Sequence, residues 1–160
     1  MEIEYVRSRF IKHFDGKTGN IYHSPGRINL IGEHTDYNGG FVFPGAVEQG
    51  IMAEVRPNGQ QTCNVYSIDL KDMVHFKIDD PKGPSATWAR YIYGVVQEMR
   101  ALGVDVKPFN AAFAGDVPLG AGMSSSAALE SCFACALNDL FGDNKVSKWD
   151  MVLAGQATEH

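Results

Sequence analysis

The sequence is short of the features that mark several large classes of protein. It holds three cysteines in 160 residues, an odd and sparse count that does not suggest a disulfide framework. No apolar run approaches the roughly 20 residues that a membrane-spanning helix needs. The first residues also lack the basic-then-apolar order of a secretory signal. We therefore expect a cytoplasmic protein with no membrane partner.

Positive charge is also scarce. Lys and Arg number 14 against 19 Asp and Glu, which gives a formal net charge of −5 at pH 7. A mildly acidic chain lacks the electrostatic attraction that nucleic acids and anionic lipids require, so we expect no nucleic-acid partner. With 44% hydrophobic residues and no internal repeats, the chain is long enough for one compact domain with a sizeable core.

The hydrophobic pattern predicts a mixture of helices and short strands. Apolar residues at helical spacing predict a helix over residues 3–14 and another from Trp88 to Leu102, with Gly103 just past its end. A further strand is predicted at 109–113. Such a mixture favours an α+β fold in two layers. Short extended runs between the first two helices predict strands at 21–23, 28–31, 41–43, 51–55, 64–68 and 74–78.

Two more helices are predicted in the last third of the chain. An Ala-, Leu- and Phe-rich segment predicts a helix that runs to about Leu140, where Phe141-Gly142 stops it. Within it, Cys132 and Cys135 have C-x-x-C spacing, which we interpret as small buried thiols because no second pair completes a zinc site. A last helix, predicted from Ser147, has no stop signal before the sequence ends. We therefore expect that the chain is a piece of a longer protein.

The first cluster of polar residues lies between Gly26 and Gly40. A sugar presents several hydroxyls, and binding them takes carboxylate, imidazole and amide groups held rigidly. A guanidinium suits the developing charge on a phosphoryl group or an attacking oxygen. A polar loop with a buried Arg–Glu pair is the structural alternative, but so many polar groups beside four glycines favour a sugar site. These polar residues are Arg27, Asn29, Glu33, His34, Asp36 and Tyr37.

The second cluster is a glycine loop followed by three serines, within residues 116–130. Glycines let the backbone approach a ligand closely, and the N–H groups that open a helix favour an anion. The lysine of a Walker A loop is absent, and Ser125 stands where a G-x-G-x-x-G motif has its third glycine. A serine-capped helix explains one serine but not three beside flanking glycines, so the loop indicates a phosphate site.

Together the two clusters resemble the galactokinases, which belong to the GHMP superfamily of small-molecule kinases. Residues 26–37, Gly-Arg-Ile-Asn-Leu-Ile-Gly-Glu-His-Thr-Asp-Tyr, look like the galactokinase sugar-site signature. Residues 118–128 look like the ATP loop of the superfamily. Residues 87–95 are similar to the segment whose tryptophan lines the adenine pocket. The resemblance implies a ribosomal-protein-S5-domain-2-like N-terminal domain over residues 1–160, truncated, with helices on one side of a mixed sheet.

The resemblance also implies an activity, which is ATP-dependent phosphorylation of α-D-galactose at its C1 hydroxyl with Mg²⁺ as the metal. Arg27 would stabilise charge beside the attacking hydroxyl. The sugar would be held by Glu33, His34 and Asp36, with Asn29 and Tyr37 in the same site. The nucleotide would contact Gly120, Ala121, Gly122, Met123, Ser124, Ser125, Ser126, Ala127 and, at its adenine, Trp88. Mg²⁺ would be bound by Ser126 and Glu159.

Several alternatives stay open. A lone tryptophan on an apolar helix face is explained equally well by core packing, so Trp88 has two interpretations. A non-catalytic galactose and ATP sensor is a second hypothesis, although the Ser126-Ala127 dipeptide favours an enzyme. A related kinase of N-acetylgalactosamine or arabinose is a third.

The aspartate that galactokinases use as proposed base lies in a Gly-Ile-Met-Asp-Gln-Phe-like stretch, which this sequence lacks along with the family's C-terminal domain. We therefore expect these 160 residues alone to be inactive. Apolar surface left uncovered could make them self-associate, whereas the parent enzyme is expected to be monomeric.

Overall fold

The structure is a computed structural model, which describes residues 1–25, 50–115 and 123–147. The strands of this part form one mixed sheet in the order β1-β2-β5-β3-β4, in which only the β3–β5 pair is parallel. The described elements are α1 (Ile3–His13), β1 (Asn20–Pro25), β2 (Gly50–Pro57), β3 (Cys63–Ser67), β4 (Asp72–Phe76), α3 (Thr87–Ala101), β5 (Phe109–Gly115) and α4 (Met123–Phe141).

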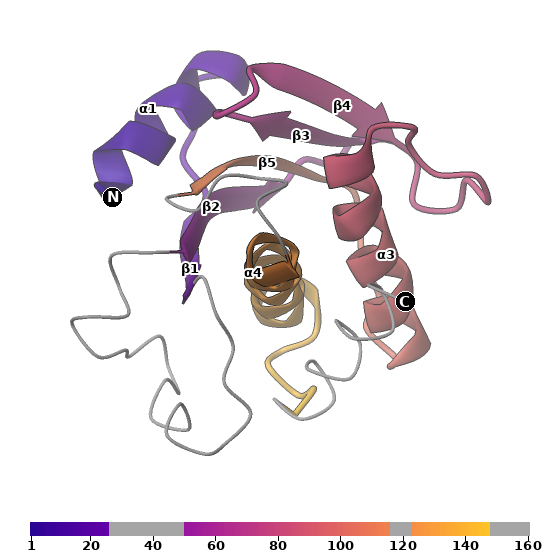
Figure 1. Cartoon of the computed structure of the whole chain (residues 1–160). Coiled ribbons are helices and arrows are strands. Elements are labelled where there is room, and N and C mark those ends of the chain that lie inside the picture. Colours follow the sequence, from indigo (N-terminus) through magenta and orange to yellow (C-terminus); the bar gives the residue numbers. More distant parts are fainter. Residues whose placement is uncertain (26–49, 116–122, 148–160) are drawn as a thin grey trace.

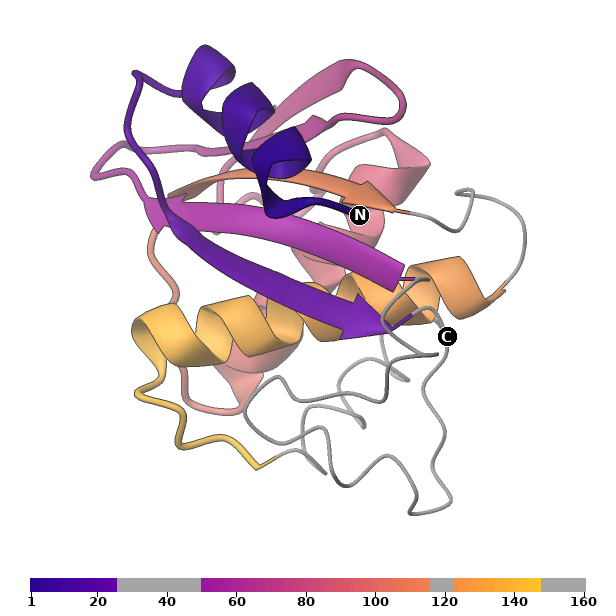
Figure 2. The same cartoon turned by 90° about the vertical axis from the view of Figure 1, so that its left-hand side faces the viewer.

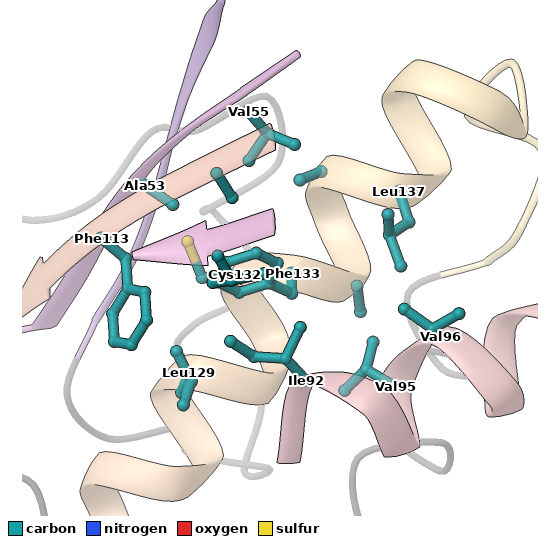
Figure 3. Packing of buried hydrophobic residues seen from close by; sticks show 14 of the residues in the cluster. Ala53, Val55, Ile92, Val95, Val96, Phe113, Leu129, Cys132, Phe133 and Leu137 are labelled. Atoms are coloured by element: carbon teal, nitrogen blue, oxygen red, sulfur yellow. The ribbon is translucent and has the colours of Figure 1, made fainter. Parts of the chain in front are cut away.

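One face of the sheet carries the main core, against which α3 and α4 pack (Figures 1 and 3). Alternate residues of β2, among them Ala53 and Val55, point to this face because successive side chains of a strand alternate. The apolar residues of α4 that are 0% exposed recur in adjacent pairs four residues apart, which gives the helix one apolar stripe. These pairs are Ala128-Leu129, Cys132-Phe133 and Ala136-Leu137.

The opposite face is covered by α1, which corrects the expectation of helices on one side only. That expectation holds for α3 and α4. Met52, Ala112 and Ala114 point away from the main core and pack with Val6 and Phe10 of α1. Because Met52, Ala112 and Ala114 make part of the second face apolar, that face needs a cover, and the predicted amphipathic helix supplies it. The α+β fold with a mixed sheet is confirmed.

The predicted elements within the described residues are present. Gly103 takes a φ of 97°, a left-handed conformation that glycine adopts without steric cost. Its N–H bonds to the carbonyl of Arg100, and the N–H of Val104 bonds to that of Met99, both at 3.0 Å. These two bonds form a Schellman motif, which ends α3 as the sequence predicts. The strands predicted at 28–31 and 41–43 and the helix predicted from Ser147 lie outside the described residues.

The interpretation of the C-x-x-C pair as two buried thiols is half right. Cys132 is fully buried, and its Sγ lies 3.6 Å from the carbonyl oxygen of Tyr22. Burial raises the pKa of the Cys132 thiol far above its ordinary value. Cys135, three residues later, is exposed because it falls outside the apolar stripe of α4.

A partly buried ion pair joins α1 to the sheet. The Glu54 side chain is fully buried, and its Oε1 accepts a hydrogen bond of 2.9 Å from Nε of Arg7. Its Oε2 accepts the backbone N–H of Gly19 at 2.6 Å, and Arg7 also donates to the carbonyl of Gly19. Both carboxylate oxygens are therefore paired, as a buried charge requires.

We expect Arg7→Met to destabilise the fold by about 3–5 kcal/mol, because it leaves the Glu54 carboxylate buried without its cation. The measurement is the free energy of unfolding in urea. Lys12→Met is the matched control, since Lys12 is exposed on the same helix and its loss should cost less than about 0.5 kcal/mol. Equal effects of the two substitutions would contradict this account of the pair.

A second polar contact fixes α4 against β1. The hydroxyl of Tyr22 donates to Oδ2 of Asp139 at 2.5 Å, and Asn144 donates to its Oδ1 at 2.9 Å. These hydrogen bonds, the first of them foremost, lower the pKa of Asp139 below its ordinary value of 3.8. Burial and the same bond raise the pKa of the Tyr22 hydroxyl.

This lowered pKa predicts an acid-dependent loss of stability. The contribution of Asp139 is fully present above the pKa that the carboxyl has in the unfolded chain and is lost as the pH falls through its lower folded pKa. Tyr22→Phe removes the main cause, so the variant should lose less free energy of unfolding than the wild type below about pH 4. The difference should be at most about 1 kcal/mol because Asp139 is exposed. If the free energy of unfolding fell equally with pH in the two proteins, Asp139 would not be the source of this loss.

Candidate functional site

The two sequence clusters are attached to one edge of the sheet. Pro25, at the end of β1, pairs with Gly50, at the start of β2, and the neighbouring Ile51 pairs with Gly115, at the end of β5. The chain thus leaves β1 toward the first cluster and leaves β5 toward the second at positions two inter-strand spacings apart, about 10 Å. Figure 2 shows β1 and β5 ending, and α4 beginning, on the same side of the molecule.

The start of β4 and the start of α3 lie at this same edge. Asp72 opens β4 and pairs with Ser67 at the end of β3, which runs parallel to β5. Its Oδ2 accepts a hydrogen bond of 3.2 Å from Nε1 of Trp88, in the first turn of α3. The ends of β1, β3 and β5 and the beginnings of β2, β4 and α3 therefore lie at the edge where the chain leaves β1 and β5.

The first turn of α4 has backbone N–H groups at this edge that the helix itself does not bond. The helix begins at Met123, so the N–H groups of its first residues, Ser124 among them, have no carbonyl four residues earlier within the helix. Such a turn favours an anion through these N–H groups and the helix dipole. Ser126, at the end of the turn, is buried.

The structure places Trp88 in the core. The side chain is 7% exposed and its ring centroid lies 5.4 Å from that of Phe113. The contacts of Trp88 in the structure are therefore those of a core residue. The contact of Trp88 with adenine stays a prediction. The indole lies at the same edge of the sheet at which β5 ends.

The remaining predicted site residues divide between the two parts of the chain. Met123, Ser124, Ser125, Ser126 and Ala127 all lie in the first turns of α4. Outside the described residues lie Arg27, Asn29, Glu33, His34, Asp36, Tyr37, Gly120, Ala121, Gly122 and Glu159.

Of the two expected Mg²⁺ ligands, Ser126 and Glu159, only Ser126 lies within the described residues. The hydroxyl oxygen of Ser126 is the kind of hard donor that Mg²⁺ prefers, and Ser126 lies in the first turn of α4, where a helix favours an anion. Residues 1–25, 50–115 and 123–147 hold no group of three or more His, Cys, Asp and Glu side chains that could bind a metal by itself. The same residues include no helix long and apolar enough to cross a membrane.

Sequence reasoning missed Asp69, which holds the end of β5. Its Oδ2 accepts the backbone N–H of Gly115 at 2.9 Å, one residue before the second cluster begins. The N–H of Ile68 bonds to the carbonyl of Phe113 at 2.9 Å, so the turn after β3 extends the pairing with β5. No local signal marks Asp69, because its partner is 46 residues away in the sequence.

Two protein-family models match the chain. The galactokinase galactose-binding signature matches residues 8–57, and the N-terminal domain of the GHMP kinases matches residues 90–160. The first match spans the segment between β1 and β2, and the second includes β5 and α4.

Individual relatives agree with these matches. The chain is 37% identical to a galactokinase of Clostridium perfringens (strain SM101 / Type A) and 39% identical to one of Roseiflexus sp. (strain RS-1), over 100% and 97% of its length. It covers 42% and 39% of those proteins, so it spans about two fifths of the length of the relatives it matches.

A solved structure of Lactococcus lactis galactokinase complexed with galactose matches 98% of the chain, and the chain covers 42% of that protein, with a TM-score of 0.77 and 34% identity. Methanococcus jannaschii mevalonate kinase shares the fold, with a TM-score of 0.59 and 18% identity over 90% of this chain and 46% of that one.

We expect Asp69→Ala to loosen the end of β5. The amide of Gly115 loses its acceptor, so its hydrogen-exchange rate should rise by about tenfold, while the amides in the middle of β5 keep theirs. Asp79→Ala is the control, since Asp79 is an exposed carboxylate elsewhere in the described chain. Unchanged exchange at Gly115 in the Asp69 variant would show that the contact does not hold the strand end.

Proposed function

Because this chain belongs to the galactokinase family, whose N-terminal portion it matches, we propose that it forms the galactose- and ATP-binding part of a galactose 1-kinase. The reaction is transfer of the γ-phosphoryl group of ATP to the C1 hydroxyl of α-D-galactose. The observation that carries the proposal is the pairing of Pro25 with Gly50 and of Ile51 with Gly115. This pairing brings the points at which the chain leaves the sheet toward the first cluster, after Pro25, and toward the second cluster, after Gly115, to one edge of the sheet.

The proposed sugar side of the site comes from residues 26–37. Glu33, His34 and Asp36 hold galactose hydroxyls, because carboxylates and an imidazole can both fix and discriminate such groups. Asn29 and Tyr37 complete the same set. Arg27 lies beside the C1 oxygen and stabilises the negative charge that develops there during transfer.

The proposed nucleotide side comes from residues 120–127 and the first turn of α4. Their backbone N–H groups bind the phosphates, and the fixed helix start keeps these donors in place. Phosphoryl transfer asks a protein for little covalent chemistry, since most of the rate comes from aligning the acceptor oxygen with the phosphorus. Ser126 and Glu159 are the proposed ligands of Mg²⁺, which neutralises phosphate charge when bound.

Turnover on this proposal also needs an aspartate base. Galactokinases place it in a Gly-Ile-Met-Asp-Gln-Phe-like stretch, and these 160 residues do not contain that stretch. We propose that this part of the enzyme binds and aligns both substrates, while the aspartate base comes from another stretch. The kinetic test therefore belongs to a protein that carries this part together with the base.

In such a protein we expect Arg27→Ala to lower kcat by about 100-fold or more, because the charge on the attacking oxygen loses its counter-ion. Coupled release of ADP measures the turnover. Arg100→Ala is the control, since Arg100 is exposed near the far end of α3, and its turnover should equal that of the wild type. Near-native kcat in the Arg27 variant would refute the role assigned to this residue.

The same assay tests the substrate. Galactose should be phosphorylated at a higher kcat/KM than N-acetylgalactosamine or arabinose. Preference for either of those sugars would replace galactose in the proposal. Binding of galactose and ATP without release of ADP would identify a sensor instead of an enzyme.

A further inference from the structure

A second candidate site lies on the α1 face of the sheet, opposite the face that α3 and α4 cover. A pocket of about 450 Å³ opens there between α1 and the end of β3, and Ile68 lies at its base. Its volume is within the range of pockets that bind small molecules. The side chains that define its chemistry are Tyr5, Arg9, Lys12, His13, Tyr66 and Lys71.

The arrangement of these residues follows from the helix and the sheet. Tyr5, Arg9 and Lys12 are spaced by four and three residues, which places them on one stripe of α1. The sheet supplies Tyr66, whose ring centroid lies 3.9 Å from that of His13. Lys71 comes from the turn between β3 and β4 and takes a φ of 53°, a left-handed conformation that is uncommon for a residue with a side chain.

The pocket concentrates positive charge on a chain whose net charge is −5. Among the residues that the structure describes, the ion pairs are Arg7–Glu54 and Lys107–Asp105, so Arg9, Lys12 and Lys71 have no carboxylate partner in this part. The guanidinium of Arg9 lies 4.1 Å above the ring of Tyr5 and donates to the Tyr5 carbonyl and the Ser8 hydroxyl.

The nearest acidic residues of the β3–β4 turn are engaged elsewhere. Asp69 accepts the N–H of Gly115, and Asp72 accepts the indole N–H of Trp88. Within the described part of the chain neither carboxylate forms an ion pair with Lys71, although the three residues lie within four positions of one another. The turn thus presents its cation to the pocket and its carboxylates to the sheet edge and α3.

We propose that this pocket binds a small molecule that carries a phosphate ester. The phosphate oxygens would be bound by Arg9, Lys12 and Lys71, since charged donors make the stronger hydrogen bonds to phosphate. The organic part would lie on the rings of Tyr5 and Tyr66, which offer flat apolar surface. A sugar phosphate and a nucleoside monophosphate share this chemistry. The inference stands independently of the proposed kinase function, because it uses none of the residues of that site.

Amide shifts in an NMR titration of the 160-residue chain test the proposal with three probes: inorganic phosphate, galactose 1-phosphate and AMP. The amides of Lys12, His13 and Lys71 should shift, and at least one ester should bind more tightly than phosphate. The tighter ester identifies the source as a sugar phosphate or a nucleotide. If neither ester exceeds phosphate, or if these amides do not shift, the proposal is overturned.

A matched pair of variants separates a pocket from general attraction. Lys12→Gln with Lys71→Gln should raise the Kd of the tighter ester at least about tenfold. Lys77→Gln with Lys82→Gln removes the same charge at exposed positions outside the pocket and should leave the Kd within about twofold. Equal weakening by both pairs would overturn the site. A preserved urea unfolding curve for each pair confirms that the variants remain folded.

Discussion

The antiparallel register of β1, β2 and β5 is the constraint on which the rest depends. Pairing Pro25 with Gly50 and Ile51 with Gly115 sets where the chain leaves the sheet toward each cluster. A slip by one residue would turn every side chain of a strand to the other face. Such a slip is excluded by β2 itself, because Ala53 belongs to the main core while Glu54 must meet Arg7 on the α1 side.

Packing on both faces of the sheet then fixes the helices relative to the edge at which β1 and β5 end. On one face, α4 is fixed to β1 by the contact of Tyr22 with Asp139, so the helix that follows residues 116–122 in the chain has a set position. On the other face, α1 is fixed through Glu54. Between these layers, Asp69 holds the end of β5 through Gly115. These contacts hold the described side of the edge from both faces of the sheet, and holding groups in position is what the alignment of two substrates requires.

The sequence predicted the elements of the fold better than their arrangement. The helical periods of α1 and α3 and the glycine that ends α3 are local patterns, and each is present in the structure. Which face of the sheet α1 covers depends on the apolar residues Met52, Ala112 and Ala114 that β2 and β5 present on their second face, and no helical period reveals them. Asp69 and Asp72 were missed for the same reason, since their partners lie 46 and 16 residues away. The motif residues of both clusters could be proposed from the sequence because their chemistry is concentrated in short segments.

The central claim is that a sugar and a nucleotide meet at this edge. Paramagnetic relaxation measures that proximity directly in a protein that carries this chain and binds both ligands, with Mn²⁺ in place of Mg²⁺, since both ions take oxygen ligands. The account predicts strong relaxation of the anomeric proton of bound galactose when the manganese–nucleotide complex is added, because the metal lies beside the phosphates. Saturation of the protein by both ligands without enhanced relaxation of that proton would place them apart and contradict the account.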